Sequence, residues 1–225
     1  TQMTVHSLDG VKECAKLGFT RAVLSRELSR DQIRYICQNS PIEIETFAHG
    51  ALCMCYSGQC YLSSVIGGRS GNRGLCAQPC RLKYGWGNRA NEYPLSLKDM
   101  SLADYLQELE EMGVCCLKIE GRMKRPEYVA IVTGIYARAI REGRSPTPEE
   151  LEQLEAAFSR QGFTQGYYLD KKGLDMFGVR QESEPPRELY AQARTTYESG
   201  ENRKELIRMY AMIRTGEPAQ VAAQD

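Results

Sequence analysis

The sequence lacks several features that would assign it at once to a common class of protein. It has no apolar run of about 18 residues, so no helix is expected to span a membrane. Its 29 Lys and Arg residues balance 29 Asp and Glu residues, which excludes a globally basic nucleic-acid binder. The chain also begins with Thr1 instead of an initiator methionine, so we expect it to lack the N-terminus of its parent protein.

Sequence motifs of several large enzyme classes are also absent. The chain has only two histidines, His6 and His49, and they do not form the two-histidine zinc motif of metalloproteases. It has no Gly-x-Ser-x-Gly nucleophile elbow, no Gly-x4-Gly-Lys phosphate loop and no dinucleotide fingerprint. A cysteine–histidine protease dyad would therefore have to use one of these two histidines.

Acidic residues are missing from one long internal segment. Residues 46–91 contain no Asp or Glu, and their five basic residues give the segment a formal charge of +5. The loop at 67–74 within it is rich in glycine, so its backbone can approach a ligand closely. Two readings are open: a site that binds an anion through forked arginine donors, or a flexible surface loop. The candidate binding residues are Arg69, Asn72, Arg73 and Arg81.

Cysteine is unusually frequent, and its placement is informative. Five of the nine cysteines fall within residues 53–80, and four of them have the spacing Cys53-x6-Cys60-x15-Cys76-x3-Cys80. Because nine is an odd number, the cysteines cannot all pair as disulfides within the chain. A reducing compartment such as the cytoplasm therefore fits the sequence better than a secreted protein with a disulfide framework. The spacing favours an iron–sulfur cluster over zinc, while buried free cysteines are a further reading. Cys115 or Cys116 could replace Cys80 as the fourth ligand.

Hydrophobic periodicity predicts alternating strands and helices at both ends of this segment. A βαβαβ order with short connections favours a parallel sheet with helical crossovers. Ser101 is expected to cap the helix that follows the cysteine-rich segment. The predicted strands are residues 2–6, 20–24, 42–47 and 114–119, and the predicted helices are 8–17, 30–37, 102–112, 126–141, 148–158 and 187–197.

Four such units make half of a TIM-type (β/α)8 barrel, which needs about 250 residues. We therefore expect the C-terminal part of a barrel at residues 1–145, with a cysteine-rich insertion at 48–91. Residues 146–184 are predicted to form a helical and irregular extension. Residues 185–225 are predicted to contain a linker helix and the start of a further small domain, with a hairpin at 207–223.

Polar residues follow two of the predicted strands. Glu45 and His49 lie at the end of one strand, and Lys118, Glu120 and Arg122 lie at the end of another. Because barrel active sites form at the C-terminal ends of strands, these five are candidate catalytic residues. A rim of solvated charges explains their spacing equally well.

Several long motifs resemble the U32 peptidase family, also called collagenase-like proteases. They are ETFAHGALC at 45–53, YSGQC at 56–60, GRSGNRGLCAQPCR at 68–81, LSLKD at 95–99 and LKIEGRMK at 117–124. The likeness covers roughly residues 1–180, and the tail resembles the extra domain of some larger members. The resemblance implies a barrel fold.

The family name implies proteolysis. Other members, however, are RNA hydroxylation proteins that add oxygen to C5 of a pyrimidine in tRNA or rRNA, carry iron–sulfur clusters and require prephenate. By this resemblance, Cys53, Cys60, Cys76 and Cys80 would be cluster ligands, and Arg69, Arg73 and Arg81 would bind prephenate or RNA phosphate. Our first hypothesis is therefore an RNA-modifying iron–sulfur enzyme. The alternatives are a peptidase that uses His49 with Cys53 or Glu45, and a zinc-stapled module without enzymatic activity.

Overall fold

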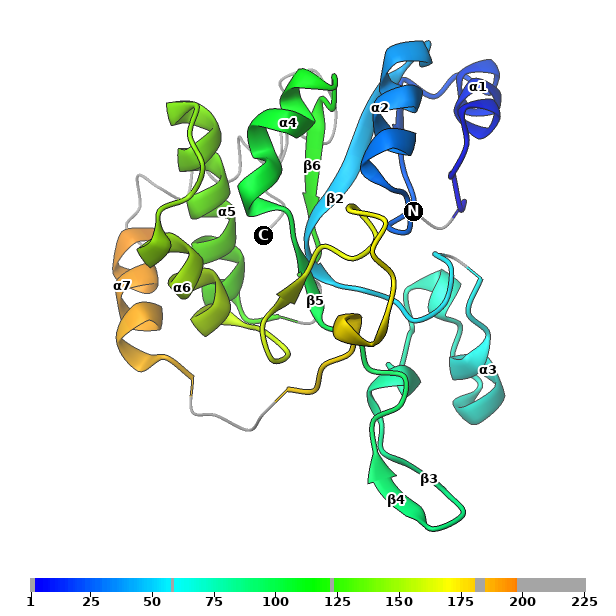
Figure 1. Cartoon of the computed structure of the whole chain (residues 1–225), viewed down its shortest axis with the longest axis vertical. Coiled ribbons are helices and arrows are strands. Elements are labelled where there is room, and N and C mark those ends of the chain that lie inside the picture. Colours follow the sequence, from blue (N-terminus) through cyan, green and yellow to red (C-terminus); the bar gives the residue numbers. More distant parts are fainter. Residues whose placement is uncertain (1–2, 58, 122–123, 181–184, 198–225) are drawn as a thin grey trace, which may run out of the picture.

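Three parallel strands form the centre of the fold, as the sequence predicts. In the computed structural model, β2 (Glu43–Ala51) lies between β1 (Arg21–Val23) and β6 (Cys116–Ile119), and both pair with it in parallel. Figure 1 shows this sheet with helices on either side of it. The structure describes residues 3–57, 59–121, 124–180 and 185–197.

The first two helices begin where the sequence supplies a capping serine. The Ser7 hydroxyl accepts a hydrogen bond from the Gly10 backbone N–H at the start of α1 (Leu8–Lys16). Ser29 and Gln32 cap each other's backbone at the start of α2 (Arg30–Asn39), which is a complete capping box. Both helices contribute apolar side chains to a core beneath the sheet, so local caps and apolar periodicity together fix this part of the fold.

The long strand β2 changes partner along its length. A register shift between Phe47 and His49 ends the regular pairing with β6, and the last residues of β2 pair antiparallel with β5 (Asp99–Ser101). Gly50 lies at this crossing with a φ of +111°, and a Cβ there would lie 2.5 Å from the Glu120 carbonyl oxygen. Only glycine permits this close approach of β2 to the end of β6.

The predicted helix cap at Ser101 is wrong, because Ser101 belongs to β5. The Leu102 N–H donates to the Ala48 carbonyl, 2.8 Å away, and thereby extends the contact with β2. The chain then forms a 3-10 turn (Ala103–Tyr105) before α4 (Leu106–Glu111). Pairing with β2 therefore overrides the local capping preference of the serine.

Five of the described strands form one open mixed sheet. Its order is β1-β2-β5-β7, with β6 also on β2 and the two-residue strand β7 (Phe163–Thr164) parallel to β5. This confirms an α/β fold, whereas the barrel stays a prediction. Residues 3–6 form no strand, because Thr4 has a φ of +53°, although the Val5 carbonyl accepts a hydrogen bond from Ser25 N–H. The predicted hairpin at 207–223 lies outside the described residues.

Three C-terminal helices pack together beside the sheet. They are α5 (Pro126–Glu142), α6 (Pro148–Ala157) and α7 (Arg187–Tyr197), which share a second apolar core. Arg194 of α7 donates to Glu127 of α5 at 2.6 Å. The predicted linker helix thus packs against the preceding part of the chain (Figure 1). In the described part of the chain, no helix combines the length and apolar character needed to cross a membrane.

The segment between β2 and β5 contains little regular structure. It holds α3 (Leu62–Gly67), two single 3-10 turns (Gly71–Arg73 and Pro79–Arg81), and a separate hairpin of β3 (Tyr84–Trp86) and β4 (Arg89–Glu92). Figure 1 shows the hairpin extending away from the central sheet. Both ends of the segment return to the sheet, which places its cysteines beside the strand ends.

Candidate functional site

A pocket of about 960 Å³ lies at the C-terminal ends of β2 and β6. Ala51, at the end of β2, and Glu120, directly after β6, both line it. Its remaining walls come from the cysteine-rich segment, the start of α5 and the chain that follows α6. Parallel strands place their C-terminal ends at one edge of a sheet, which is where ligands bind in α/β proteins.

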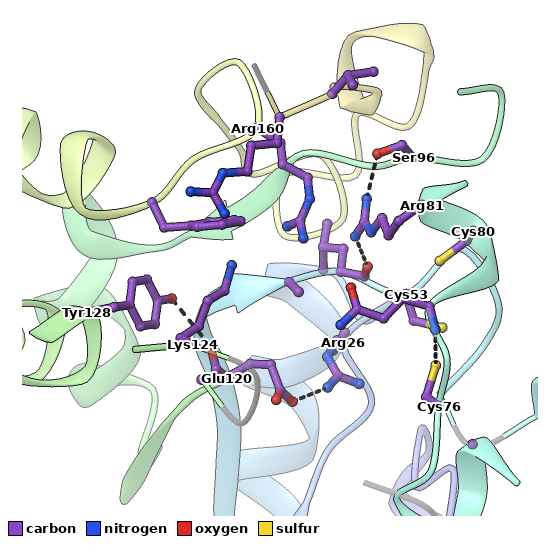
Figure 2. A pocket seen from close by; sticks show the side chains of 18 of the residues that line it. Arg26, Cys53, Cys76, Cys80, Arg81, Ser96, Glu120, Lys124, Tyr128 and Arg160 are labelled. Atoms are coloured by element: carbon purple, nitrogen blue, oxygen red, sulfur yellow. Dashed lines mark hydrogen bonds and ion pairs between the residues drawn. The ribbon is translucent and has the colours of Figure 1, made fainter. Parts of the chain in front are cut away.

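The four cysteines singled out by their spacing all line this pocket: Cys53, Cys60, Cys76 and Cys80. Figure 2 shows three of them on one side of the pocket, opposite Lys124 and Tyr128. The Cys76 sulfur accepts a hydrogen bond from the Gln78 backbone N–H at 3.3 Å. Within the described ranges, no three His, Cys, Asp or Glu side chains lie close enough together to ligate a single metal ion.

Burial is the main cause that raises the pKa of the Cys53 thiol to about 11. The Cys80 and Cys60 thiols act in the same direction, whereas a hydrogen bond from the Cys55 backbone and the nearby Arg26 act against the rise. Cys53 is therefore protonated at neutral pH in the absence of a bound cation. Because metals bind the thiolate form, ligation at this position would release a proton.

The two cysteines predicted as possible substitute ligands lie elsewhere. Cys116 is the first residue of β6 and Cys115 directly precedes it; neither lines the pocket. The Cys115 sulfur donates to the Ile44 carbonyl at 3.1 Å and lines a second hollow together with Cys37. The structure thus brings Cys80, and neither of the proposed substitutes, to the wall that carries the other three cysteines.

Cationic side chains dominate the rest of the pocket. Among the described residues, seven Arg and Lys side chains line it against one carboxylate, Glu120. Arg26 donates to that carboxylate at 2.9 Å, and Arg160 and Lys118 have carboxylate partners outside the lining, which leaves an excess of positive charge. The unbalanced positive charge suits an anionic ligand. The seven are Arg26, Arg81, Lys118, Lys124, Arg125, Arg160 and Arg180.

Arg81 ties together the two ends of the cysteine-rich segment. Its guanidinium donates to the Leu52 carbonyl at 2.6 Å, to the Ser96 hydroxyl at 3.0 Å and to the Leu97 carbonyl. Leu52 directly precedes Cys53, and Arg81 itself directly follows Cys80. Arg81 therefore positions the cysteine wall and itself lines the pocket (Figure 2).

Arg160 is fixed by a buried carboxylate. One of its terminal nitrogens lies 2.7 Å and 2.5 Å from the two oxygens of Asp99 on β5. Both side chains are buried, so removing their charges from water is costly. The close contact of the guanidinium with both carboxylate oxygens offsets this cost. Asp99 thereby holds a cation at the pocket wall.

Lys124 has the most perturbed amine among the pocket residues. Burial lowers its pKa to about 7, and the positive charges of Arg160, Arg180 and Arg81 add to this effect, although Asp99 opposes it. The ammonium lies over the Phe158 ring. A lysine of this kind is poised between its charged and neutral forms near neutral pH.

The other predicted binding residues are divided between the pocket and the surface. Asn72 lines the pocket, whereas Arg69 and Arg73 do not. The Arg69 side chain donates to the Leu75 carbonyl at 3.0 Å and so shapes its own loop. Arg122 lies outside the described residues.

The two predicted catalytic residues on β2 do not line the pocket, although each contacts a residue that does. Glu45 is 3.8 Å from both Lys118 and Arg21. His49 is 1% exposed and packs against the rings of Tyr128, Tyr136 and Phe163. Burial lowers its pKa to about 3, so the imidazole is neutral. Of the predicted strand-end residues, Lys118 and Glu120 reach the pocket.

Several pocket residues were missed by sequence reasoning. Arg26 follows β1 by three positions, so the strand-end rule that selected Glu120 would also have found it. Tyr128, Phe158, Arg160 and Arg180 come from helices or irregular chain far along the sequence. No local pattern marks them, because only the tertiary fold brings them to the cysteines.

Comparison with known proteins gives a consistent result. The family described as "Peptidase family U32" matches residues 1–177. The chain is 43% identical over 146 residues to the 23S rRNA 5-hydroxycytidine C2501 synthase of Escherichia coli, covering 62% of this chain and 22% of that protein. It is 38% identical over 199 residues to tRNA hydroxylation protein P1 of Bacillus subtilis, covering 79% and 47%.

A protein named collagenase from Porphyromonas gingivalis is 36% identical over 197 residues, covering 76% of this chain and 47% of that protein. The chain therefore spans about half or less of the length of these relatives. No solved structure matches it. The family match covers most of the chain and includes all four pocket cysteines, so the chain belongs to peptidase family U32.

Proposed function

We propose that this chain is part of an RNA-modifying enzyme that hydroxylates C5 of a pyrimidine base with the help of an iron–sulfur cluster. One observation carries the proposal: four cysteines and seven cationic side chains line the same pocket. A redox group and an anionic substrate would thus meet in one place. The names of the rRNA and tRNA hydroxylating relatives support the choice of RNA.

The donor set fits a cluster better than a single zinc ion. Zinc needs four ligands within about 2.3 Å of one centre, whereas a cubane cluster spreads its ligands over a larger volume. The four sulfurs line a shared pocket without forming a single-ion site among the described residues. Cys53, Cys60, Cys76 and Cys80 would hold the cluster, which would supply electron transfer when bound.

The chain's own residues would bind and orient the anionic partners. Arg26 and Arg81 lie near the cysteine wall and would offset the negative charge of thiolate ligands. On the opposite wall, Lys124, Arg160 and Arg180 would bind phosphate or a carboxylate such as that of prephenate, the proposed co-substrate. RNA and reduced thiols together favour a cytoplasmic location.

The test is RNA hydroxylation by the full-length parent protein. Cells that produce the wild type should contain RNA with one additional oxygen on a pyrimidine nucleoside, detected by mass spectrometry of nucleoside digests. Cells with Cys53→Ala or Cys76→Ala should lack it, while the matched control Cys115→Ala, outside the pocket, should retain it. Loss in the control, or retention in the pocket variants, would contradict the proposal.

A peptidase is the second candidate, because one group of relatives carries the name collagenase. It would need an activated nucleophile, and His49 with Cys53 or Glu45 is the available set. His49 packs within the core and does not line the pocket with Cys53, so the geometry favours RNA modification. Gelatin hydrolysis by purified full-length protein that disappears in His49→Ala would reverse this ranking.

A further inference from the structure

Within the part of the chain that the structure describes, the hairpin of β3 and β4 is exposed along most of its length. Every residue of β4 is exposed, and so are the last two residues of β3. A two-stranded sheet is marginally stable by itself in water. Figure 1 shows the hairpin extending away from the helices and the central sheet. The exposed residues of the hairpin therefore contribute no packing to the core of the described fold.

The only tryptophan in the chain lies at the tip of this hairpin. Trp86 is 90% exposed and directly precedes the Gly87-Asn88 turn, where Gly87 has a φ of +57°. Tryptophan has the largest apolar surface of any side chain, and exposing it fully to water is unfavourable. An isolated ring at a projecting tip is thus available to stack on a flat partner.

The base of the hairpin is connected to the pocket. The Tyr84 hydroxyl donates to the Pro79 carbonyl at 2.9 Å, and Pro79 is the residue before the pocket cysteine Cys80. Lys83 lies 5.8 Å from the ring centre of Tyr93, and Tyr93 lines the pocket. A strand of substrate held at the tip would therefore lead toward the cysteine wall.

The hairpin carries one cation near its tip and another at its base. Arg89 is the register partner of Trp86, and Lys83 lies just before β3. The hairpin belongs to the segment of residues 46–91 that has no acidic residue, and Glu92 at its end is the first carboxylate. An exposed aromatic ring flanked by cations is the combination with which proteins bind single-stranded nucleic acids.

From this juxtaposition we propose that the β3–β4 hairpin is a binding element for single-stranded RNA, in which Trp86 stacks on a base and Arg89 and Lys83 contact phosphates. The inference rests on the proposed function, since it deepens the RNA-binding role of the same protein. Val65 and Ile66 of α3 are also exposed, but their aliphatic side chains offer no ring that could stack on a base.

The single tryptophan makes the test direct. Excited at a wavelength that tyrosine does not absorb, the intrinsic fluorescence of this chain reports on Trp86 alone during titration with a single-stranded RNA 12-mer of mixed sequence. Stacking should quench the emission in a saturable way. Anisotropy of the labelled 12-mer should then show about 5- to 150-fold weaker binding by Trp86→Ala and partial rescue by Trp86→Phe. A plot of log affinity against log salt concentration should be less steep for Arg89→Gln, by about one unit of slope, because one phosphate contact is lost.

Tyr35→Ala supplies the matched control, because Tyr35 is an exposed ring on α2, remote in sequence from the hairpin, and its loss should leave RNA affinity unchanged. If wild type and Trp86→Ala bind the 12-mer equally, the hairpin proposal fails while RNA as substrate survives. If no variant binds RNA, both the hairpin proposal and the RNA function fail. Equal quenching by dextran sulfate would mean that charge alone acts, and would overturn the stacking role.

Discussion

At the level of single side chains, the buried pair of Arg160 and Asp99 supports the cationic wall of the pocket. Replacing Arg160 with Met leaves the Asp99 carboxylate buried without its partner, so we expect the free energy of unfolding to fall by about 3–5 kcal/mol. Urea denaturation measures this change. The double variant Arg160→Met/Asp99→Leu should recover part of the loss, and equal stability of wild type and single variant would contradict the role of the pair.

The lowered pKa of Lys124 makes stability depend on pH. The unfolded lysine has a pKa of about 10.4, so between about pH 7 and pH 10 the unfolded state binds a proton that the folded state does not. The destabilisation is fully present below pH 7 and is relieved as pH rises through this window. The urea midpoint of the wild type should thus increase with pH relative to that of Lys124→Met, and parallel profiles would argue against a buried amine.

Sequence reasoning at this scale found the cysteines but only part of the cationic wall. The cysteines share one segment, so their spacing revealed them. Arg160 and Arg180 reach the pocket from chain that carries no local signal. His49 was predicted to lie in the pocket because it is close to the end of a strand. The structure instead buries its side chain among aromatic rings, next to the register shift after Phe47.

At the level of secondary-structure elements, Gly50 determines how closely β2 and β6 approach. An alanine there would require both an unfavourable φ and a contact with the Glu120 carbonyl, so Gly50→Ala should destabilise the chain by about 2–4 kcal/mol. Thermal denaturation would show the loss. Gly67→Ala is the matched control, because a Cβ at that helix residue meets open space and should cost nothing.

Arg81 fixes the cysteine-rich segment as a unit. In Arg81→Met, the Leu52 and Leu97 carbonyls lose their donor, so amide hydrogen exchange across residues 52–98 should accelerate while α1 and α2 remain protected. Arg73→Met is the control, since Arg73 does not line the pocket. Uniform acceleration throughout the chain would instead indicate a general loss of stability.

Elements with strong local signals were predicted and short ones were not. The capping residues Ser7 and Ser29 and the proline at the start of α5 mark helix starts that the structure confirms. β5 and β7 are three and two residues long, and they exist because β2 and β5 offer an edge to pair with. No pattern of local sequence predicts a pairing of that kind.

For the molecule as a whole, net neutrality conceals a strongly polarised charge distribution. The acid-free segment supplies one wall of a cationic pocket, and residues from the rest of the chain complete it. The account of function depends on that pocket holding an iron–sulfur cluster on Cys53, Cys60, Cys76 and Cys80. The barrel and the extra domain stay predictions, and the chain spans about half or less of the length of its relatives.

The most direct measurement is iron and acid-labile sulfide analysis, with a visible spectrum, of anaerobically purified full-length protein. The account predicts brown protein with stoichiometric iron and sulfide, both lost in Cys53→Ala, Cys60→Ala or Cys76→Ala and retained in Cys115→Ala. Colourless protein with stoichiometric zinc, or iron that survives these pocket substitutions, would contradict it.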